Sequence, residues 1–121
     1  MPQWYSAVLV LRSHVGAGSD AEAVLDHQVR LIAAADPEAA YASAIQLGKR
    51  EEHSYRNAEG QEVRWEFVGL HDLVELIEPP ANGAEVYSWL TGHSDQAGVR
   101  PKPQLAVFRV EAEARRKAQH P

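Results

Sequence analysis

Histidine and carboxylate side chains are the residues of this chain that could support acid–base or metal chemistry. The sequence has six histidines and no cysteine, so a metal site would rely on imidazole and carboxylate ligands. No two histidines have the H-x-x-x-H or H-x-H spacing that places both rings on one face. His71 and Asp72 are neighbours, which point to opposite faces of a strand. The spacing predicts no metal and no other cofactor; a site assembled from distant strands is the alternative left open.

Carboxylates gather in the middle of the chain, at Glu62, Glu66, Asp72, Glu75 and Glu78. Arg64 has the strand parity of Glu62 and Glu66, so these three side chains are expected to form weak pairs on a solvent-facing side. Acid–base catalysis by paired carboxylates needs a pocket that raises one pKa, and the sequence shows no sign of one. We therefore predict no catalytic residue.

The segment from Ala84 to Leu90, A-E-V-Y-S-W-L, is the best place to look for a specific site. Ser88 does not lie in G-x-S-x-G, so it is not predicted to be a nucleophile. Aromatic residues that stay exposed beside polar ones would mark a partner surface. The candidate partner or ligand surface consists of Trp65, His71, Glu85, Tyr87, Ser88 and Trp89.

Size and charge narrow the classes of function. A chain of 121 residues suits one domain, and a net charge of −5 disfavours a broad phosphate-binding surface, so nucleic acid is not an expected partner. The absence of cysteine fits a reducing compartment. No signal peptide and no apolar run of membrane length is recognised, so we expect a cytoplasmic protein with no membrane association.

The elements that must position these residues begin with a hairpin from Ser54 to Ile77. Its turn is expected at Asn57–Gly60, where glycine can supply the positive φ that a tight turn requires. Alternation then directs one set of side chains toward the core, namely Val63, Trp65 and Phe67. Gly69 predicts a bulge that switches the faces, after which Val74 and Leu76 carry the apolar pattern.

The preceding half of the chain supplies the partners for this hairpin. Residues from Trp4 to Val15 are apolar in both alternating sets, which predicts a central strand, and Val24–Ala34 predicts a strand antiparallel to it. Asp36 and Pro37 are typical of a helix start, so a helix is expected from Pro37 to about Glu52. Its alanines allow it to approach the sheet closely.

Together these elements predict an α+β fold of ββαββ order: an antiparallel sheet of about four strands with one main helix on one face. Residues 1–92 are expected to form a single domain. Residues 93–121 would follow as a linker and a C-terminal helix, packed on the same domain or on a partner. A strand is the alternative for the last segment, because it also alternates, but two Glu-to-basic pairs four residues apart favour a helix.

Several short segments, in order, resemble a family of small bacterial proteins, domain of unknown function 4288. They are Trp4-Tyr5, Asp36-Pro37-Glu38-Ala39-Ala40, Asn57-Ala58-Glu59-Gly60, Trp65-Glu66-Phe67-Val68 and Gly83-Ala84-Glu85-Val86-Tyr87-Ser88. The resemblance covers about residues 3–90. The family pattern has threonine where this chain has Ala84, and usually a polar residue where it has Trp89. It implies one bacterial domain and no particular activity.

Two classes of function follow. The first is a non-enzymatic protein-interaction module, with a homodimer and an immunity- or antitoxin-type inhibitor as its two forms, because one sheet face needs a cover and an acidic surface complements a basic partner. The second is a small-molecule binder or enzyme with a pocket between the hairpin and the segment Glu85–Ser88, lined by Trp65, His71, Glu85 and Tyr87.

Overall fold

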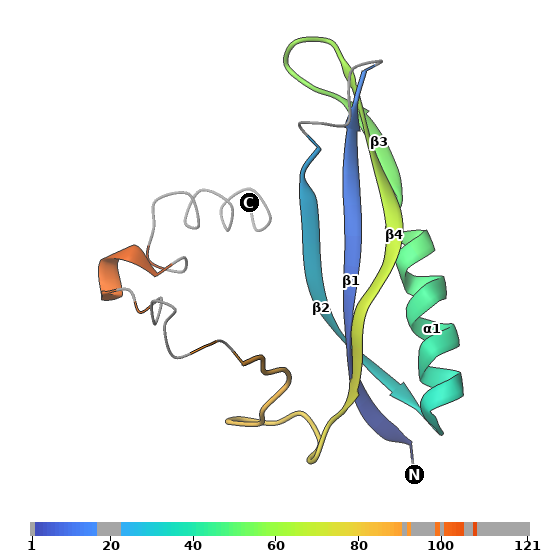
Figure 1. Cartoon of the computed structure of the whole chain (residues 1–121), viewed down its shortest axis with the longest axis vertical. Helices are drawn as coiled ribbons and strands as arrows, with labels where there is room; N and C mark the ends of the chain where they lie inside the picture. Colours follow the sequence, from blue (N-terminus) through green and yellow to red (C-terminus); the bar gives the residue numbers. More distant parts are fainter. Residues whose placement is uncertain are drawn as a thin grey trace, which may run out of the picture. The chain divides into compact units, whose positions relative to one another are not determined.

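A four-stranded antiparallel sheet with one helix forms the first part of the chain (Figure 1). The computed structural model describes residues 2–16, 23–90, 92, 99, 101–105 and 108. The elements in chain order are β1 (Gln3–Val15), β2 (Leu25–Ala34), α1 (Pro37–Arg50), β3 (His53–Arg56) and β4 (Glu62–Glu75). The sheet order is β2-β1-β4-β3. The predicted α+β class, with four antiparallel strands and one main helix, is confirmed.

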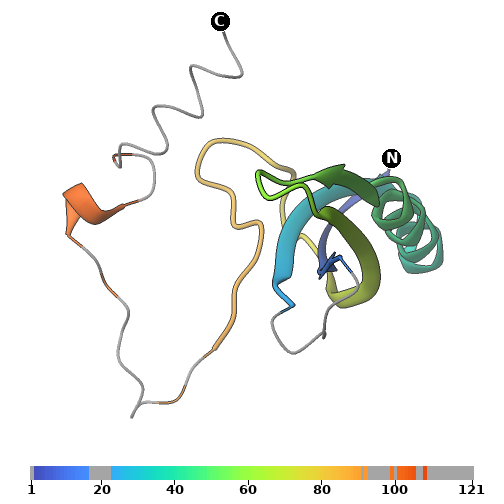
Figure 2. The same ribbon diagram turned by 90° about the horizontal axis from the view of Figure 1, so that it is seen from above.

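Strand β1 lies between β2 and β4, as its two apolar faces predicted. It pairs with β2 in an unbroken register from Gln3 opposite Ala34 to Arg12 opposite Leu25. On its other side it pairs with β4, from Tyr5 opposite Glu75 to Val15 opposite Val63. Figure 2 shows the curl of this sheet from above.

Helix α1 begins where the sequence indicated. The carboxylate of Asp36 accepts a hydrogen bond from the amide of Ala39 at 2.8 Å, and Pro37 occupies the first turn. Ala40, Ala44 and Gly48 are the buried residues of the helix. A Cβ at Gly48 would collide with the ring of Phe67, so the absence of a side chain lets this turn press against β4.

The core lies between α1 and the face of the sheet that α1 covers. Its buried members are Tyr5, Ala7, Leu9, Leu11, Ile32, Ala34, Ala40 and Ala44. Trp65 and Phe67 of β4 are partly buried and pack against this cluster, as predicted. Burial of these apolar side chains is the main term that stabilises the α1 side of the sheet.

Strand β4 corrects one prediction. The register with β1 shifts twice near Gly69. Leu9 lies opposite Leu70 and Ala7 lies opposite Leu73, whereas Val68 and His71 have no residue opposite them in β1. A single bulge would have moved the α1-facing side chains from odd to even residue numbers along the rest of β4. The second bulge returns them to odd numbers. Leu70 and Leu73 therefore continue the α1-facing set, and Val74 lies on the opposite face.

A second compact unit, Trp89–Pro121, follows the first unit, Met1–Ser88. Its described part includes a 3₁₀ turn, η2 (Lys102–Gln104), and the ammonium group of Lys102 lies 5.4 Å from the ring centroid of Phe108. Most of the predicted C-terminal helix lies outside the described residues.

Candidate functional site

The sheet face opposite α1, called the open face from here on, is covered only in part. The register places Ser6 and Val8 of β1 on it, beside Leu31 and Val29 of β2 and beside Val74 and Asp72 of β4. Ser6 is 0% exposed and Val8 3% exposed, whereas Val29 and Leu31 are 46% and 44% exposed. The open face is thus buried along its centre and exposed along β2.

The cover over its centre is the extended segment Glu85–Ser88. The hydroxyl of Ser6 donates a hydrogen bond to the carbonyl oxygen of Val86, eighty residues away in sequence. The hydroxyl of Tyr87 donates to Asp72 Oδ2 at 3.3 Å. These contacts hold the segment against β1 and β4.

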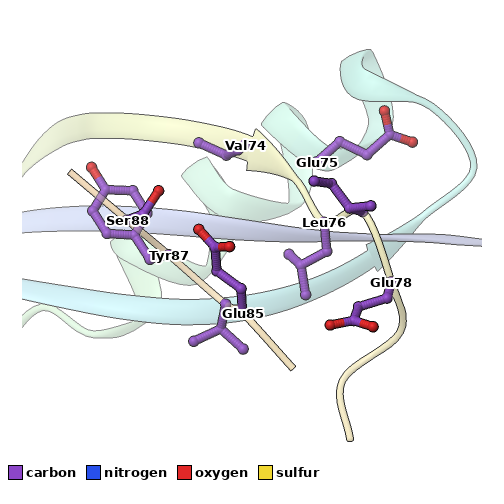
Figure 3. Close-up of a pocket in the computed structure, with 9 residues that line it drawn as sticks. Val74, Glu75, Leu76, Glu78, Glu85, Tyr87 and Ser88 are labelled. Carbon is purple, nitrogen blue, oxygen red and sulfur yellow. The ribbon is translucent and has the colours of Figure 1, made fainter. Parts of the chain in front are cut away.

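A pocket of about 380 Å³ lies between this segment and the end of β4 (Figure 3). Its lining consists of Val74, Glu75, Leu76, Ile77, Glu78, Glu85, Val86, Tyr87 and Ser88. Figure 3 shows the Glu75 carboxylate pointing away from the other labelled side chains. Glu78 and Glu85 are therefore the acidic groups available to a bound molecule, above an apolar lining.

The pocket combines a hydrogen-bond donor with acidic and apolar groups. Burial, and to a smaller extent the neighbouring Asp72 carboxylate, raise the pKa of Tyr87, so its hydroxyl stays protonated and can act as a hydrogen-bond donor. Carboxylates beside apolar side chains suit a ligand with a positive charge and a short hydrocarbon part. Within the described residues, no group of three or more His, Cys, Asp or Glu side chains is arranged to hold a metal ion.

Three of the six predicted site residues line this pocket: Glu85, Tyr87 and Ser88. Trp65 packs instead against the core beneath α1. Trp89 begins the second unit and is exposed.

His71 is exposed on β4 and is not part of the pocket lining. Its ring lies edge to face with that of His27, with the ring centroids 6.0 Å apart. His27 comes from β2, and the two strands flank β1 at Val10. This pair connects the two sides of the open face.

Two parts of the site were not identified from the sequence. One is the pocket wall Val74–Glu78, which continues beyond the end of β4 at Glu75 and whose signal was the double proline directly after Glu78. The other is the exposed apolar row on β2, formed by Leu25, Val29 and Leu31. Its signal was the alternation of these residues with Asp26, Gln28 and Arg30.

On the opposite side of β2, the stretch from Asp26 to Arg30 is polar, whereas Ile32 and Ala34 belong to the core. Gln28 donates to Asp26 Oδ2 at 2.8 Å, and Arg30 donates to Gln28 Oε1 at 3.0 Å. Arg30 also lies 3.3 Å from a carboxylate oxygen of Glu51, directly after α1. These contacts hold Asp26, Gln28 and Arg30 in a ladder along one side of the strand.

Comparison with protein-family models matched residues 4–88 to the model described as Domain of unknown function (DUF4288). The match covers both the open face and the pocket. Searches of curated proteins and of solved structures gave no match. In the part of the chain that the structure describes, no helix has the length and apolar character needed to cross a membrane.

Proposed function

We propose that this chain, which belongs to the family described as Domain of unknown function (DUF4288), works as a protein-interaction module without enzymatic activity. The observation that carries the proposal is the apolar row on β2. Leu25, Val29 and Leu31 lie on one side of one strand, and each exposes more than two fifths of its surface. Apolar residues that form a continuous exposed patch mark surfaces that bind other proteins.

The surroundings of this row support the same function. Val74 on β4 and Val86 on the covering segment are each 41% exposed, so apolar surface is available on both sides of the buried centre. His27 lies between Leu25 and Val29 on the same side of β2 and adds a polar group. An apolar centre with polar groups beside it is the common composition of protein interfaces.

The proposal is tested by site-specific photo-crosslinking in the cells from which the chain comes. A benzophenone amino acid at Val29 should give covalent adducts with protein, whereas the same group at Ala42, on the exposed side of α1, should give none. Adducts at neither position, or equal yields at both, would contradict the proposal. The identity of the crosslinked protein, determined by mass spectrometry of its peptides, distinguishes the two forms of the proposal. A second copy of this chain indicates a homodimer, and a basic protein indicates the immunity- or antitoxin-type inhibitor.

Two expectations from the sequence are part of this proposal. A cytoplasmic location is tested by fractionating those cells. A C-terminal helix within residues 93–121, as a second contact for the partner, is tested by the change in helical circular dichroism when the chain is truncated after residue 92.

A second candidate function rests on the pocket. Its volume of about 380 Å³ is in the range of sites for small molecules. Glu78 and Glu85 favour an organic cation, so putrescine should raise the melting temperature of the protein. Glu85→Gln should remove this effect, while Glu59→Gln in the hairpin turn should keep it. An equal response of the two variants would exclude binding in the pocket.

A further inference from the structure

We infer that the partner is a second copy of this chain, which pairs its β2 antiparallel to the first β2 in a register centred on Gln28. This inference rests on the proposed function and gives it a specific partner. The pairing would join two four-stranded sheets into one continuous sheet of eight strands. Three features of the molecule carry the argument: the free edge, the charge pattern of β2 and the apolar row.

The sheet has two edges, and they differ. The β2 edge is ten residues long, and its register with β1 has no shift. A regular edge strand presents a row of backbone N–H and C=O groups to another strand.

The opposite edge is interrupted. Strand β3 has four residues, and the part of β4 beyond it carries both register shifts. Where β3 no longer covers β4, the carboxylate of Glu52 accepts a hydrogen bond from the amide of Phe67 at 3.0 Å. Bulges and side chains of this kind prevent strand addition, so only the β2 edge is suited to receive another strand.

Symmetry then limits the register. A twofold axis perpendicular to the sheet places residues directly opposite each other only when they lie on the same face. With the axis at Gln28, Asp26 lies opposite the partner's Arg30, and Arg30 lies opposite the partner's Asp26. Charges of opposite sign therefore meet twice at one interface.

Twofold axes at the neighbouring residues do not place Asp26 opposite the partner's Arg30. An axis at Val29 places Asp26 opposite the partner's Ile32, and an axis at Arg30 places two guanidinium groups opposite each other. An axis at His27 places Arg30 opposite the partner's Val24. The intrachain ladder does not prevent the pairing, because a guanidinium group has five N–H donors and Arg30 can keep Glu51 while it binds a further carboxylate.

The same register also covers the apolar row. On the open face, Leu25 lies opposite the partner's Leu31, and Val29 lies opposite the partner's His27. The exposed leucines of both copies would thus contact each other across the new strand pair. One register satisfies the charged side and the apolar side of β2 together.

The first experiment measures mass and register on the full chain. Light scattering should give twice the chain mass of 13.4 kDa. Since the chain has no cysteine, Gln28→Cys introduces a single thiol close to the twofold axis, and two facing strand residues are within disulfide reach. Oxidation should give a covalent dimer at least about tenfold faster than with Val29→Cys or Ala42→Cys. A monomer at high concentration, or faster crosslinking of Val29→Cys, would overturn the inference.

The second experiment swaps charges. Asp26→Arg and Arg30→Asp should each weaken self-association by at least about tenfold, because each places like charges opposite each other. Mixing the two variants should restore dimers, since one copy then carries two arginines and the other two aspartates. Glu59→Arg is the matched control, and melting curves show whether each variant is folded. Failure of the mixture to form dimers would contradict the register.

The two proposals fail in different ways. A monomeric chain whose Val29 crosslinks to another protein would overturn the second copy and leave the interaction module intact. A monomeric chain without adducts at Val29 would overturn both.

Discussion

The two faces of the sheet are built from one central strand and are closed by different means. On the α1 side, small residues of the helix form one buried cluster with Leu9 and Leu11, and Gly48 lies against the ring of Phe67. On the open face, an extended segment covers Ser6, and the β2 side chains beside it stay exposed. A strand that is apolar on both faces needs two covers, and this unit supplies one helix and one short segment.

The difference predicts that substitutions on the two faces affect different properties of the protein. The α1 side is packed by buried aliphatic and aromatic groups, so changes there should act on folding. The open face exposes apolar surface, so changes along β2 should act on association and leave folding nearly unaffected. The expected effects below decrease in that order.

The largest effect should come from truncating the core on the α1 side. Leu9 is fully buried, and Leu9→Ala should lower the free energy of unfolding by about 2–5 kcal/mol, because it removes apolar contacts and leaves a cavity. Leu31→Ala, on the open face, should cost less than about 1 kcal/mol at low protein concentration. Urea denaturation measures both. Equal losses would mean that the two faces contribute alike to folding.

A smaller loss should follow from adding bulk between α1 and β4. Gly48→Val places a branched side chain where the ring of Phe67 lies, so it should destabilise the protein by about 1–3 kcal/mol. Ala42→Val on the exposed side of α1 is the matched control and carries only the propensity cost of a β-branched residue. Thermal unfolding compares the two variants. If they melt together, Phe67 moves aside at little cost.

Removing the N-terminal cap of α1 should lower the free energy of unfolding by less than either of these changes. Asp36→Ala removes the acceptor for the amide of Ala39 and should cost about 1 kcal/mol. Asp36→Ser keeps an acceptor and should recover most of that loss. Chemical denaturation of the three proteins measures this order, and a serine variant as unstable as the alanine variant would show that the carboxylate's charge matters more than its hydrogen bond.

The smallest effect concerns the cover of the open face. Tyr87→Phe removes the hydrogen bond to Asp72 and should lower stability slightly at pH 7. Burial and Asp72 raise the pKa of Tyr87 in the native state, so above about pH 10, the ordinary tyrosine value, the unfolded chain loses its proton first. Native stability then falls as pH rises toward the raised pKa.

Tyr87→Phe removes this contribution to the pH dependence. The stability difference between the wild type and Tyr87→Phe should therefore shrink above pH 10, as followed by urea denaturation across the alkaline range. A difference that stays constant with pH would show that the tyrosine hydroxyl is equally accessible in both states. Tyr5 also has a raised pKa, caused first by burial, so part of the alkaline loss should persist in the variant.

Local signals in the sequence predicted most of the fold. The two apolar sets of β1, the Asp36-Pro37 helix start and the turn before Gly60 each act through neighbours in the chain, and the structure has all three. Gly60 has a φ of 77°, the left-handed value that the hairpin turn required. Patterns of this kind can be read without knowing the tertiary structure.

The other features of the fold and of the site depend on contacts between residues that are far apart in the sequence. The second register shift in β4 exists only relative to β1, so no periodicity within β4 alone predicts that Leu70 and Leu73 share a face. The pocket similarly needs Val86 to lie over Ser6. The sequence placed a pocket between the hairpin and Glu85–Ser88, but the hairpin residues that line it are Val74–Ile77 and not Trp65 and His71.

The hydrogen bond from the amide of Phe67 to the carboxylate of Glu52 limits how many chains could join edge to edge into one sheet. A protein with two receptive sheet edges would add copies at both ends and polymerise into a fibre, whereas a chain that blocks one edge with a carboxylate can add only one neighbour. If the chain assembles through β2 as inferred, assembly would stop at two chains, and replacing Glu52 would remove one of the barriers to open-ended polymerisation.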